Sequence, residues 1–159
     1  MIYQIIYIVA LVAANLLVAM IGPWFSVVNS FLLIGLDLTL RDKLHDKWNG
    51  NPLKIGGLIV VAGVVSYLLN PASGQIAIAS VVAFTLSMAA DSFVYQKLKD
   101  QSWEKRTTGS NLAGAAVDSL AFPTIAFGGL MPEIVAMQFA SKVLGGLIWT
   151  KALKNKGEA

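Results

Sequence analysis

Residues 109–129 read "GSNLAGAAVDSLAFPTIAFGG", an apolar stretch with Asp118 near its middle and Pro123 five residues later. A stretch of roughly 20 apolar residues is long enough to cross the hydrocarbon core of a bilayer as a helix. A plain membrane anchor avoids both a buried charge and a residue that interrupts helical hydrogen bonding. The combination predicts a membrane helix that contributes polar groups to the interior of a bundle.

The composition of the whole chain agrees with a membrane setting. Of its 159 residues, 56% are hydrophobic and only 13% are charged, with a mean hydropathy of +0.67, whereas soluble domains carry about 25% charged residues. We therefore expect an all-α integral membrane protein that forms one compact domain over residues 1–159. Its first apolar run lacks a charged start and is longer than the core of a signal peptide, so we expect a retained span.

Apolar segments and turn signals divide the chain into six predicted transmembrane helices. These spans cover about 2–22, 24–43, 54–70, 75–97, 110–130 and 133–151. Gly22-Pro23, Asn70-Pro71 and Leu130 to Pro132 join alternate pairs of spans by short, nearly uncharged turns.

The basic residues predict the orientation of these spans. Four Lys or Arg lie in 41–54, four in 97–106, and Lys151, Lys154 and Lys156 lie in the tail. Eleven of the twelve basic residues share one side only if the chain crosses six times with both termini on that side. Because basic loops stay in the cytoplasm, we expect both termini inside a bacterial-type inner membrane.

Several function classes lack the residues that they need. The chain has no cysteine and one histidine, which leaves no basis for a disulfide or a metal site. It has no phosphate-binding loop of the ATPase type and no Ser/His/Asp or His-Glu-x-x-His set, so we expect neither an enzyme nor a cofactor. The positive-inside bias explains the basic residues, so no nucleic-acid partner is expected. Transport or channel function remains.

Asp118 and Lys142 are charged residues inside predicted spans, where insertion of one charge costs about 2.5–3.5 kcal/mol. At 1.5 Å per residue, both are expected about 13 Å from the cytoplasmic ends of antiparallel helices, and hence at one depth. Gln138 lies on the same helical face as Lys142. The two charges either form a structural ion pair or belong to a ligand site near the midplane.

Pro123 supplies no amide proton, so the Ser119 carbonyl beside Asp118 loses its helical partner. We expect a broken or kinked helix at this point. Freed backbone groups at membrane depth are tolerated where they line a cavity or are buried in protein. A kink that only improves helix packing is the alternative.

Five further polar residues lie in or near the predicted spans. Asp37 and Arg41 stand four residues apart, which favours a structural pair at the cytoplasmic end of the second span. Asp91 either lines a pore or lies at the membrane interface. Asn15 can form a hydrogen bond with another helix or with a ligand. His45 lies in a charged stretch and is expected to be solvated.

Three segments resemble the VUT family of queuosine precursor transporters, for which a role in vitamin uptake was also proposed. They are "GLDLTLRDKLHDKW" (35–48), "AADSFVYQKL" (89–98) and, most specifically, "RTTGSNLAGAAVDSLAFPTIAFGG" (106–129), which begins at Arg106. The resemblance extends over almost the whole chain. It implies a six-helix importer of 7-deazaguanine precursors, notably 7-cyano-7-deazaguanine.

A guanine-like base has adjacent N–H donors that one carboxylate can accept together. Asp118 is our first candidate for this role, and Asp91 is the second. Lys142 and Gln138 are expected to contact the carbonyl or ring nitrogens, and Asn15 can also serve the carbonyl. Aromatic side chains can stack on the base, and the candidates are Phe93, Phe122 and Trp149. Structural or gating roles are assigned to Asp37, Arg41, Arg106 and Pro123.

Energy coupling has several candidate forms. A secondary transporter could couple import to protons through Asp118 or Asp91, or import could be facilitated diffusion. A substrate-binding subunit of the energy-coupling-factor type would need an ATPase partner. A small oligomeric channel whose acids line a water path is the alternative of a different class. A homodimer is compatible with six short helices.

Overall fold

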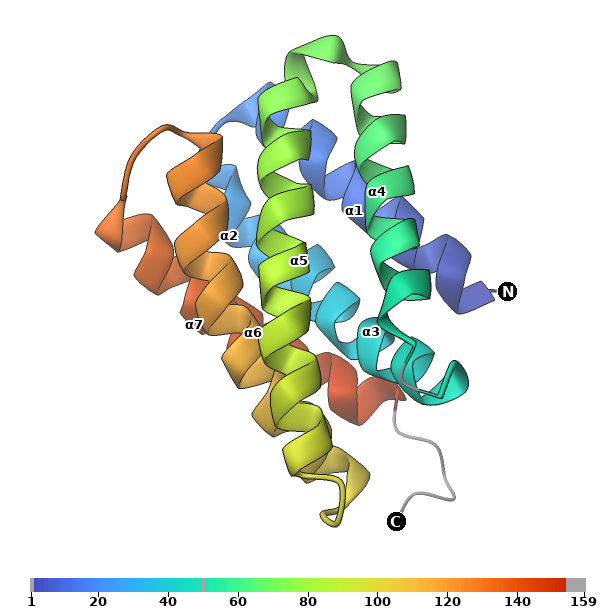
Figure 1. Cartoon of the computed structure of the whole chain (residues 1–159). Coiled ribbons are helices and arrows are strands. Elements are labelled where there is room, and N and C mark those ends of the chain that lie inside the picture. The colour runs from blue at the N-terminus through green and yellow to red at the C-terminus, as the bar shows by residue number, and fades with distance from the viewer. Residues whose placement is uncertain (1, 50, 154–159) are drawn as a thin grey trace.

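The computed structural model describes residues 2–49 and 51–153, and every regular element within these ranges is helical (Figure 1). The elements are α1 (Ile2–Ile21), α2 (Phe25–Asn29), the π-helical turn η1 (Ser30–Ile34), α3 (Gly35–Lys47), α4 (Pro52–Leu69), the 3-10 turn η2 (Pro71–Ser73), α5 (Gly74–Lys97), α6 (Trp103–Ala126) and α7 (Pro132–Leu153). Because α2, η1 and α3 follow one another without a break, they form one long segment, which we call the α2–α3 rod. The prediction of six helical segments is confirmed.

The joints between helices lie at two opposite ends of the bundle. The α1–α2, α4–α5 and α6–α7 connections lie at the upper end in Figure 1, and the α3–α4 and α5–α6 connections lie at the lower end. Gly22 has φ +107°, a conformation that glycine adopts without strain, at the first of the upper turns. The two basic loops therefore share one end, as the charge pattern predicts. Lys154 and Lys156 lie outside the described residues.

Only part of the bundle is apolar enough to qualify as membrane spans by length and hydropathy. The segments Ile2–Ile21 and Pro71–Lys97 do so, and Leu53–Leu69 is apolar but shorter. The α2–α3 rod, α6 and α7 fail this test of composition because they carry polar and charged residues. Many of those residues are buried, among them Asp37, Asp118 and Lys142. The polar helices thus direct their charges toward the interior.

Helix ends differ from the limits set by hydropathy. α3 continues to Lys47, beyond the predicted end at 43, and α6 begins at Trp103 rather than at 110. A helix continues as long as its backbone hydrogen bonds form, whereas an apolar run ends at the first charged residues. α6 ends near Gly128, whose φ of +75° is incompatible with a continued helix.

Of the break or kink predicted at Pro123, a break is not found. α6 runs through this residue to Ala126, and the Phe127 amide donates to the Pro123 carbonyl at 3.0 Å. Pro123 lies in the last turn, so its missing amide removes a hydrogen bond only near the end of the helix. The irregular backbone lies instead in the π-helical turn η1, which the sequence analysis does not anticipate. Such turns often occur at functional sites.

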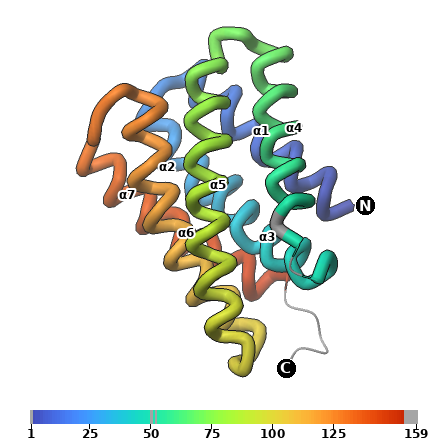
Figure 2. The backbone as a smooth tube through the Cα atoms, in the orientation of Figure 1, coloured from blue at the N-terminus to red at the C-terminus, as the bar shows by residue number. Residues whose placement is uncertain are grey.

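The α2–α3 rod occupies the middle of the bundle. It contacts α1, α4, α6 and α7, while α5 packs along α6 and α4 packs against α1 and α5 (Figure 2). The main apolar cluster joins α1, α3, α4 and α5 through residues that include Tyr7, Leu11, Leu38, Leu44, Ile59 and Phe84. Polar groups on the rod are therefore surrounded by other helices.

Glycines allow α7 to approach the rod at backbone distance. A Cβ on Gly35 would lie 2.7 Å from the Gly145 carbonyl carbon, and one on Gly145 would overlap the Phe31 carbonyl oxygen. Thr39 Oγ1 also donates to the Gly146 carbonyl at 3.4 Å. Small residues commonly mark such close crossings in membrane bundles. This crossing positions the face of α7 that carries Lys142.

Substitution of Gly145 tests whether this crossing supports the fold. Gly145→Ala should lower the free energy of unfolding by roughly 1–3 kcal/mol, as overpacking typically does. Thermal unfolding of the purified protein in detergent measures the change. Gly57→Ala is the matched control, because an added Cβ there has no neighbour within 4 Å. Equal stability of the two variants would contradict a requirement for close approach.

Candidate functional site

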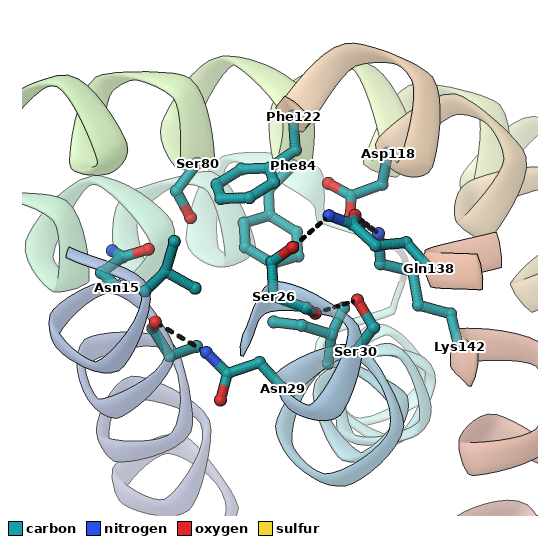
Figure 3. Close-up of a pocket in the computed structure, with 13 residues that line it drawn as sticks. Asn15, Ser26, Asn29, Ser30, Ser80, Phe84, Asp118, Phe122, Gln138 and Lys142 are labelled. Atoms are coloured by element: carbon teal, nitrogen blue, oxygen red, sulfur yellow. Dashed lines mark hydrogen bonds and ion pairs between the residues drawn. The ribbon is translucent and has the colours of Figure 1, made fainter. Parts of the chain in front are cut away.

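A small polar cavity lies among α1, the α2–α3 rod, α5, α6 and α7 (Figure 3). Its lining consists of Ala14, Asn15, Val18, Ser26, Asn29, Ser30, Ile34, Ser80, Phe84, Asp118, Phe122, Gln138 and Lys142. The cavity volume is about 20 Å³, which leaves room for about one water molecule. Polar groups from five helical segments therefore converge on one point inside an apolar bundle.

An ion pair between α6 and α7 forms one wall of the cavity. Lys142 Nζ lies 2.7 Å from Asp118 Oδ2, and both side chains are at most 4% exposed. The same ammonium donates to Gln138 Oε1 at 2.9 Å and to Ser119 Oγ at 3.0 Å. An ammonium has three N–H donors, so these contacts can use all of them. The charge is thereby held in a single position.

The polar network continues from α7 to the rod. Gln138 Nε2 donates to Ser26 Oγ at 2.7 Å, and the Ser26 hydroxyl donates to the Pro23 carbonyl. Ser30 Oγ donates to the Ser26 carbonyl at 2.7 Å. Because both ends of the Gln138 amide are bonded, its orientation is set by Lys142 on one side and Ser26 on the other.

One acceptor at the cavity is unused. Asp118 Oδ1 is buried and has no hydrogen-bond partner. The amide donors of two neighbouring residues are engaged, since Asn15 Nδ2 donates to Ser66 Oγ at 3.1 Å and Asn29 Nδ2 donates to the Ala14 carbonyl at 2.9 Å. The rings of Phe84 and Phe122 border the same space (Figure 3). A flat ligand with N–H donors would meet both a free carboxylate oxygen and aromatic walls.

A second polar cluster surrounds Arg41. Arg41 Nε lies 3.5 Å from Asp91 Oδ2, and Nη1 donates to Ser87 Oγ at 3.4 Å. Ser87 Oγ donates in turn to the Gly114 carbonyl at 2.9 Å. The ion pair of Arg41 is thus with Asp91 on α5, and the carboxylate oxygens of Asp37 make no hydrogen bond. Asp91 lies outside the lining of the central cavity.

A third polar cluster lies at the end that carries the basic loops. Arg106 Nη2 lies 3.7 Å from Asp46 Oδ1, and the Tyr95 hydroxyl donates to Asp46 Oδ2 at 2.8 Å. The Arg106 guanidinium also lies 4.1 Å from the centre of the Tyr95 ring. Arg106 therefore links the start of α6 to the ends of α3 and α5.

The prediction that His45 is solvated is wrong. The residue is 8% exposed and packs edge-to-face on Tyr95, with ring centres 5.3 Å apart. The reason is that α3 extends past the predicted end of the span, so His45 is held on a packed helix. Burial lowers the pKa of His45.

The candidate aromatic walls separate into two groups. Phe122 borders the cavity, whereas Phe93 is 61% exposed and lies under the Lys97 ammonium. Trp149 Nε1 donates to the Leu32 carbonyl at 3.2 Å, at the contact between α7 and the rod. Neither Phe93 nor Trp149 lines the cavity.

Some lining residues were not candidates in the sequence analysis. On α5, Ser80 and Phe84 precede Ser87 and Asp91 at spacings of four, three and four residues, so all four share one helical face. This periodic spacing is the sequence pattern that could have identified Ser80 and Phe84 as lining residues. On the rod, Ser26, Asn29 and Ser30 form a polar stripe of the same kind.

Larger hollows on the surface have a different character. The groove between α4 and α5 has a volume of about 410 Å³ and includes Val60, Val64, Ile78 and Val82 in its lining. Such a surface has no polar group that could orient a polar ligand. The central cavity is smaller, but charged and amide side chains line it.

Removal of one partner of the Lys142–Asp118 pair should destabilise the protein. Lys142→Met leaves the Asp118 charge without its partner and should cost about 3–5 kcal/mol of unfolding free energy. The double variant Asp118→Asn, Lys142→Met should recover part of that loss, because neither charge remains. Thermal unfolding in detergent of both single variants and the double variant measures this. Losses that simply add would show that the two residues are not coupled.

Comparison with known proteins identifies the family. A family described as "Putative vitamin uptake transporter", the VUT family, matches residues 2–153. No curated protein and no solved structure matches the chain. The match covers nearly the entire chain, including the three segments that carry the resemblance and all helices of the bundle. The chain belongs to the VUT family of uptake transporters.

Proposed function

We propose that this protein imports a queuosine precursor, 7-cyano-7-deazaguanine, and that the substrate binds at the central cavity. The family supports uptake transport as the general activity. The observation that carries the choice of site is the free Asp118 Oδ1 in a cavity bordered by Phe84 and Phe122. The proposed substrate follows from the family resemblance, and the chemistry of this cavity is compatible with it.

The groups at the cavity complement a guanine-like edge. A carboxylate can accept adjacent N–H groups, and charge-assisted hydrogen bonds of this kind are stronger than neutral ones. If Lys142 gives up its bond to Ser119 and Gln138 its bond to Ser26, both supply donors for the carbonyl of the base. The aromatic rings can stack on its plane. Asp118 can turn one oxygen to the substrate while Lys142 holds the other at 2.7 Å.

Binding requires that the cavity widens. Pockets for small ligands commonly measure about 300–1,000 Å³, whereas this cavity has a volume of about 20 Å³. The hydrogen bond between Gln138 and Ser26 closes the contact between α7 and the rod. Separation of these two helices would expose Asp118 and Lys142 to a ligand. Such movement of one helix group against another is the usual basis of alternating access.

The proposal includes six membrane crossings with both termini in the cytoplasm of a bacterial-type cell. Its support is the position of both basic loops at the same end of the bundle (Figure 1). Transport without chemical conversion of the substrate is part of the proposal. A subunit of the energy-coupling-factor type is the second candidate, since uptake of a vitamin through such a subunit also fits the family description.

Uptake of labelled 7-cyano-7-deazaguanine tests the substrate and the site together. In cells that cannot synthesise this base, the parent protein should support uptake, and Asp118→Asn should abolish it at equal membrane abundance. The substitution replaces one carboxylate oxygen by an amide donor, which opposes the N–H groups of the base. No uptake by the parent would reject the proposed substrate. Uptake by proteoliposomes that contain only this chain would exclude an obligatory ATPase partner.

Two phenylalanines provide a matched comparison for the location of the site. Phe122→Leu should weaken substrate binding, because the ring borders the cavity, with a loss of about 0.5–1.5 kcal/mol for one aromatic contact. Phe93→Leu should leave binding unchanged, since Phe93 is exposed outside the cavity. Calorimetric titration of the purified variants gives both affinities. A larger effect at Phe93 would place the site elsewhere.

A further inference from the structure

Asp37 is a buried acid that neither the ion pairs nor the cavity accounts for. It is 0% exposed, and neither carboxylate oxygen has a hydrogen-bond partner. The Tyr7 hydroxyl on α1 is equally buried and interacts with the Asp37 carboxyl, without a hydrogen bond of ordinary geometry. Asp37 lies on the side of the α2–α3 rod that packs against other helices, whereas Val28 and Leu32 lie on its exposed side. A polar group in this position normally satisfies its hydrogen bonds, so its isolation calls for a cause.

The charged and titratable groups around Asp37 come from several helices. Tyr7 of α1, Arg41 of α3, Asp91 of α5 and Asp118 of α6 interact with it electrostatically. On α7, Lys142 is bound to Asp118. On α4, Tyr67 is exposed and Lys54 lies near Trp48 beside the α3–α4 loop, so neither faces Asp37.

The charges of this interior do not balance. Asp37, Asp42, Asp91 and Asp118 are at most 3% exposed, and the cations paired with acids of this group are Arg41 and Lys142, at 1% each. Lys142 is paired with Asp118, and Arg41 with Asp91. Asp37 is left without an ion pair in this cluster. A buried carboxylate without a partner is strongly unfavourable, and such a group takes up a proton instead.

We propose that Asp37 is a proton-binding site that couples substrate import to proton movement. Asp37 carries a proton in the conformation described here. When its O–H bond breaks, the proton passes to water at the cytoplasmic end, and the electron pair stays on the carboxylate. The coupling part of this inference rests on the proposed function as an importer, whereas the protonation of Asp37 does not.

Coupling requires a group with two alternative positions. Arg41 is this group, because it can pair either with Asp91 or with Asp37. It stands four residues from Asp37 on the same helix, a spacing at which oppositely charged side chains attract each other. While Asp37 is neutral, Arg41 is paired with Asp91 at 3.5 Å. An ionised Asp37 competes with Asp91 for the same guanidinium. Loss of the proton therefore shifts Arg41 from α5 toward its own helix.

Movement of Arg41 would change the packing of α6, which lines the cavity. A Cβ on Gly114 would lie only 2.9 Å from Arg41 Nη2, so α6 packs directly against the guanidinium. Gly114 precedes Asp118 by four residues, on the same face of α6. A displaced guanidinium thus changes the contact between α5 and α6 one turn away from the candidate substrate acceptor.

Two further acids on α3 lie between Asp37 and the end that carries the basic loops. Asp42 follows Arg41, and its buried oxygens have no hydrogen-bond partner. Asp46 lies nine residues from Asp37, about 13 Å along the helix axis. It borders a hollow of about 360 Å³ at the end that carries the basic loops. Because Asp42 and Asp46 lie around the helix from Asp37 and not on its face, release of the proton toward this end is part of the proposal.

Infrared difference spectroscopy tests the protonation of Asp37 independently of any substrate. The protein in lipid at neutral pH is compared with Asp37→Asn, an isosteric and uncharged variant, and with Asp100→Asn, which removes an exposed acid. The spectrum of the parent minus Asp37→Asn should contain the carbonyl band of a protonated carboxyl. The same difference with Asp100→Asn should contain carboxylate bands. Carboxylate bands in the Asp37 difference would overturn the proposal.

Transport into proteoliposomes tests the coupling. With an inward proton gradient, the parent should accumulate labelled 7-cyano-7-deazaguanine up to about tenfold for each pH unit, if one proton moves with each molecule. Asp37→Asn should exchange the base across the membrane without accumulating it. Accumulation by Asp37→Asn equal to that of the parent would overturn the coupling. If the parent binds no such base, the proposed substrate fails, and the infrared comparison alone decides whether Asp37 binds a proton.

Discussion

The need to neutralise charges inside an apolar bundle is the constraint on which the rest of this structure depends. Asp118 and Lys142, on adjacent helices, meet at 2.7 Å, and Arg41 reaches across to Asp91 at 3.5 Å. The first pair joins the consecutive helices α6 and α7, and the second joins α3 to α5. Separation of either pair would leave a charge buried without its partner, which costs far more than an exposed ion pair contributes. The ion pairs therefore restrict how these helices can turn and separate.

Close backbone packing makes these pairs possible. Gly35 and Gly145 let α7 approach the rod, and Gly114 gives Arg41 its place against α6. Lys142 lies three residues before Gly145, so the same crossing that brings the backbones together also directs the ammonium toward Asp118. Without a strong hydrophobic drive between helices in lipid, such contacts and interhelical hydrogen bonds supply much of the association energy.

The three polar clusters follow the bundle from its centre to the end with the basic loops. The central one combines an ion pair with hydrogen bonds that Gln138 extends to the rod. The next contains Arg41, and the last ties Arg106 to Asp46. Together they form a polar interior within helices whose outward faces carry many apolar side chains. That arrangement suits a transporter of the VUT family, because a polar substrate needs polar groups at membrane depth.

The sequence by itself determined the helical segments, the two sets of loops and the common depth of Asp118 and Lys142. Turn residues and charges mark helix ends, and a constant rise per residue converts position along the chain into depth. Only the tertiary structure decided that Arg41 pairs with Asp91 and that Phe84 and Phe122, not Phe93, border the cavity. Lipid is as apolar as a protein core, so hydrophobic periodicity does not reveal which face of a membrane helix turns inward. Helix rotation, and with it the partner of each buried charge, is decided by packing between helices.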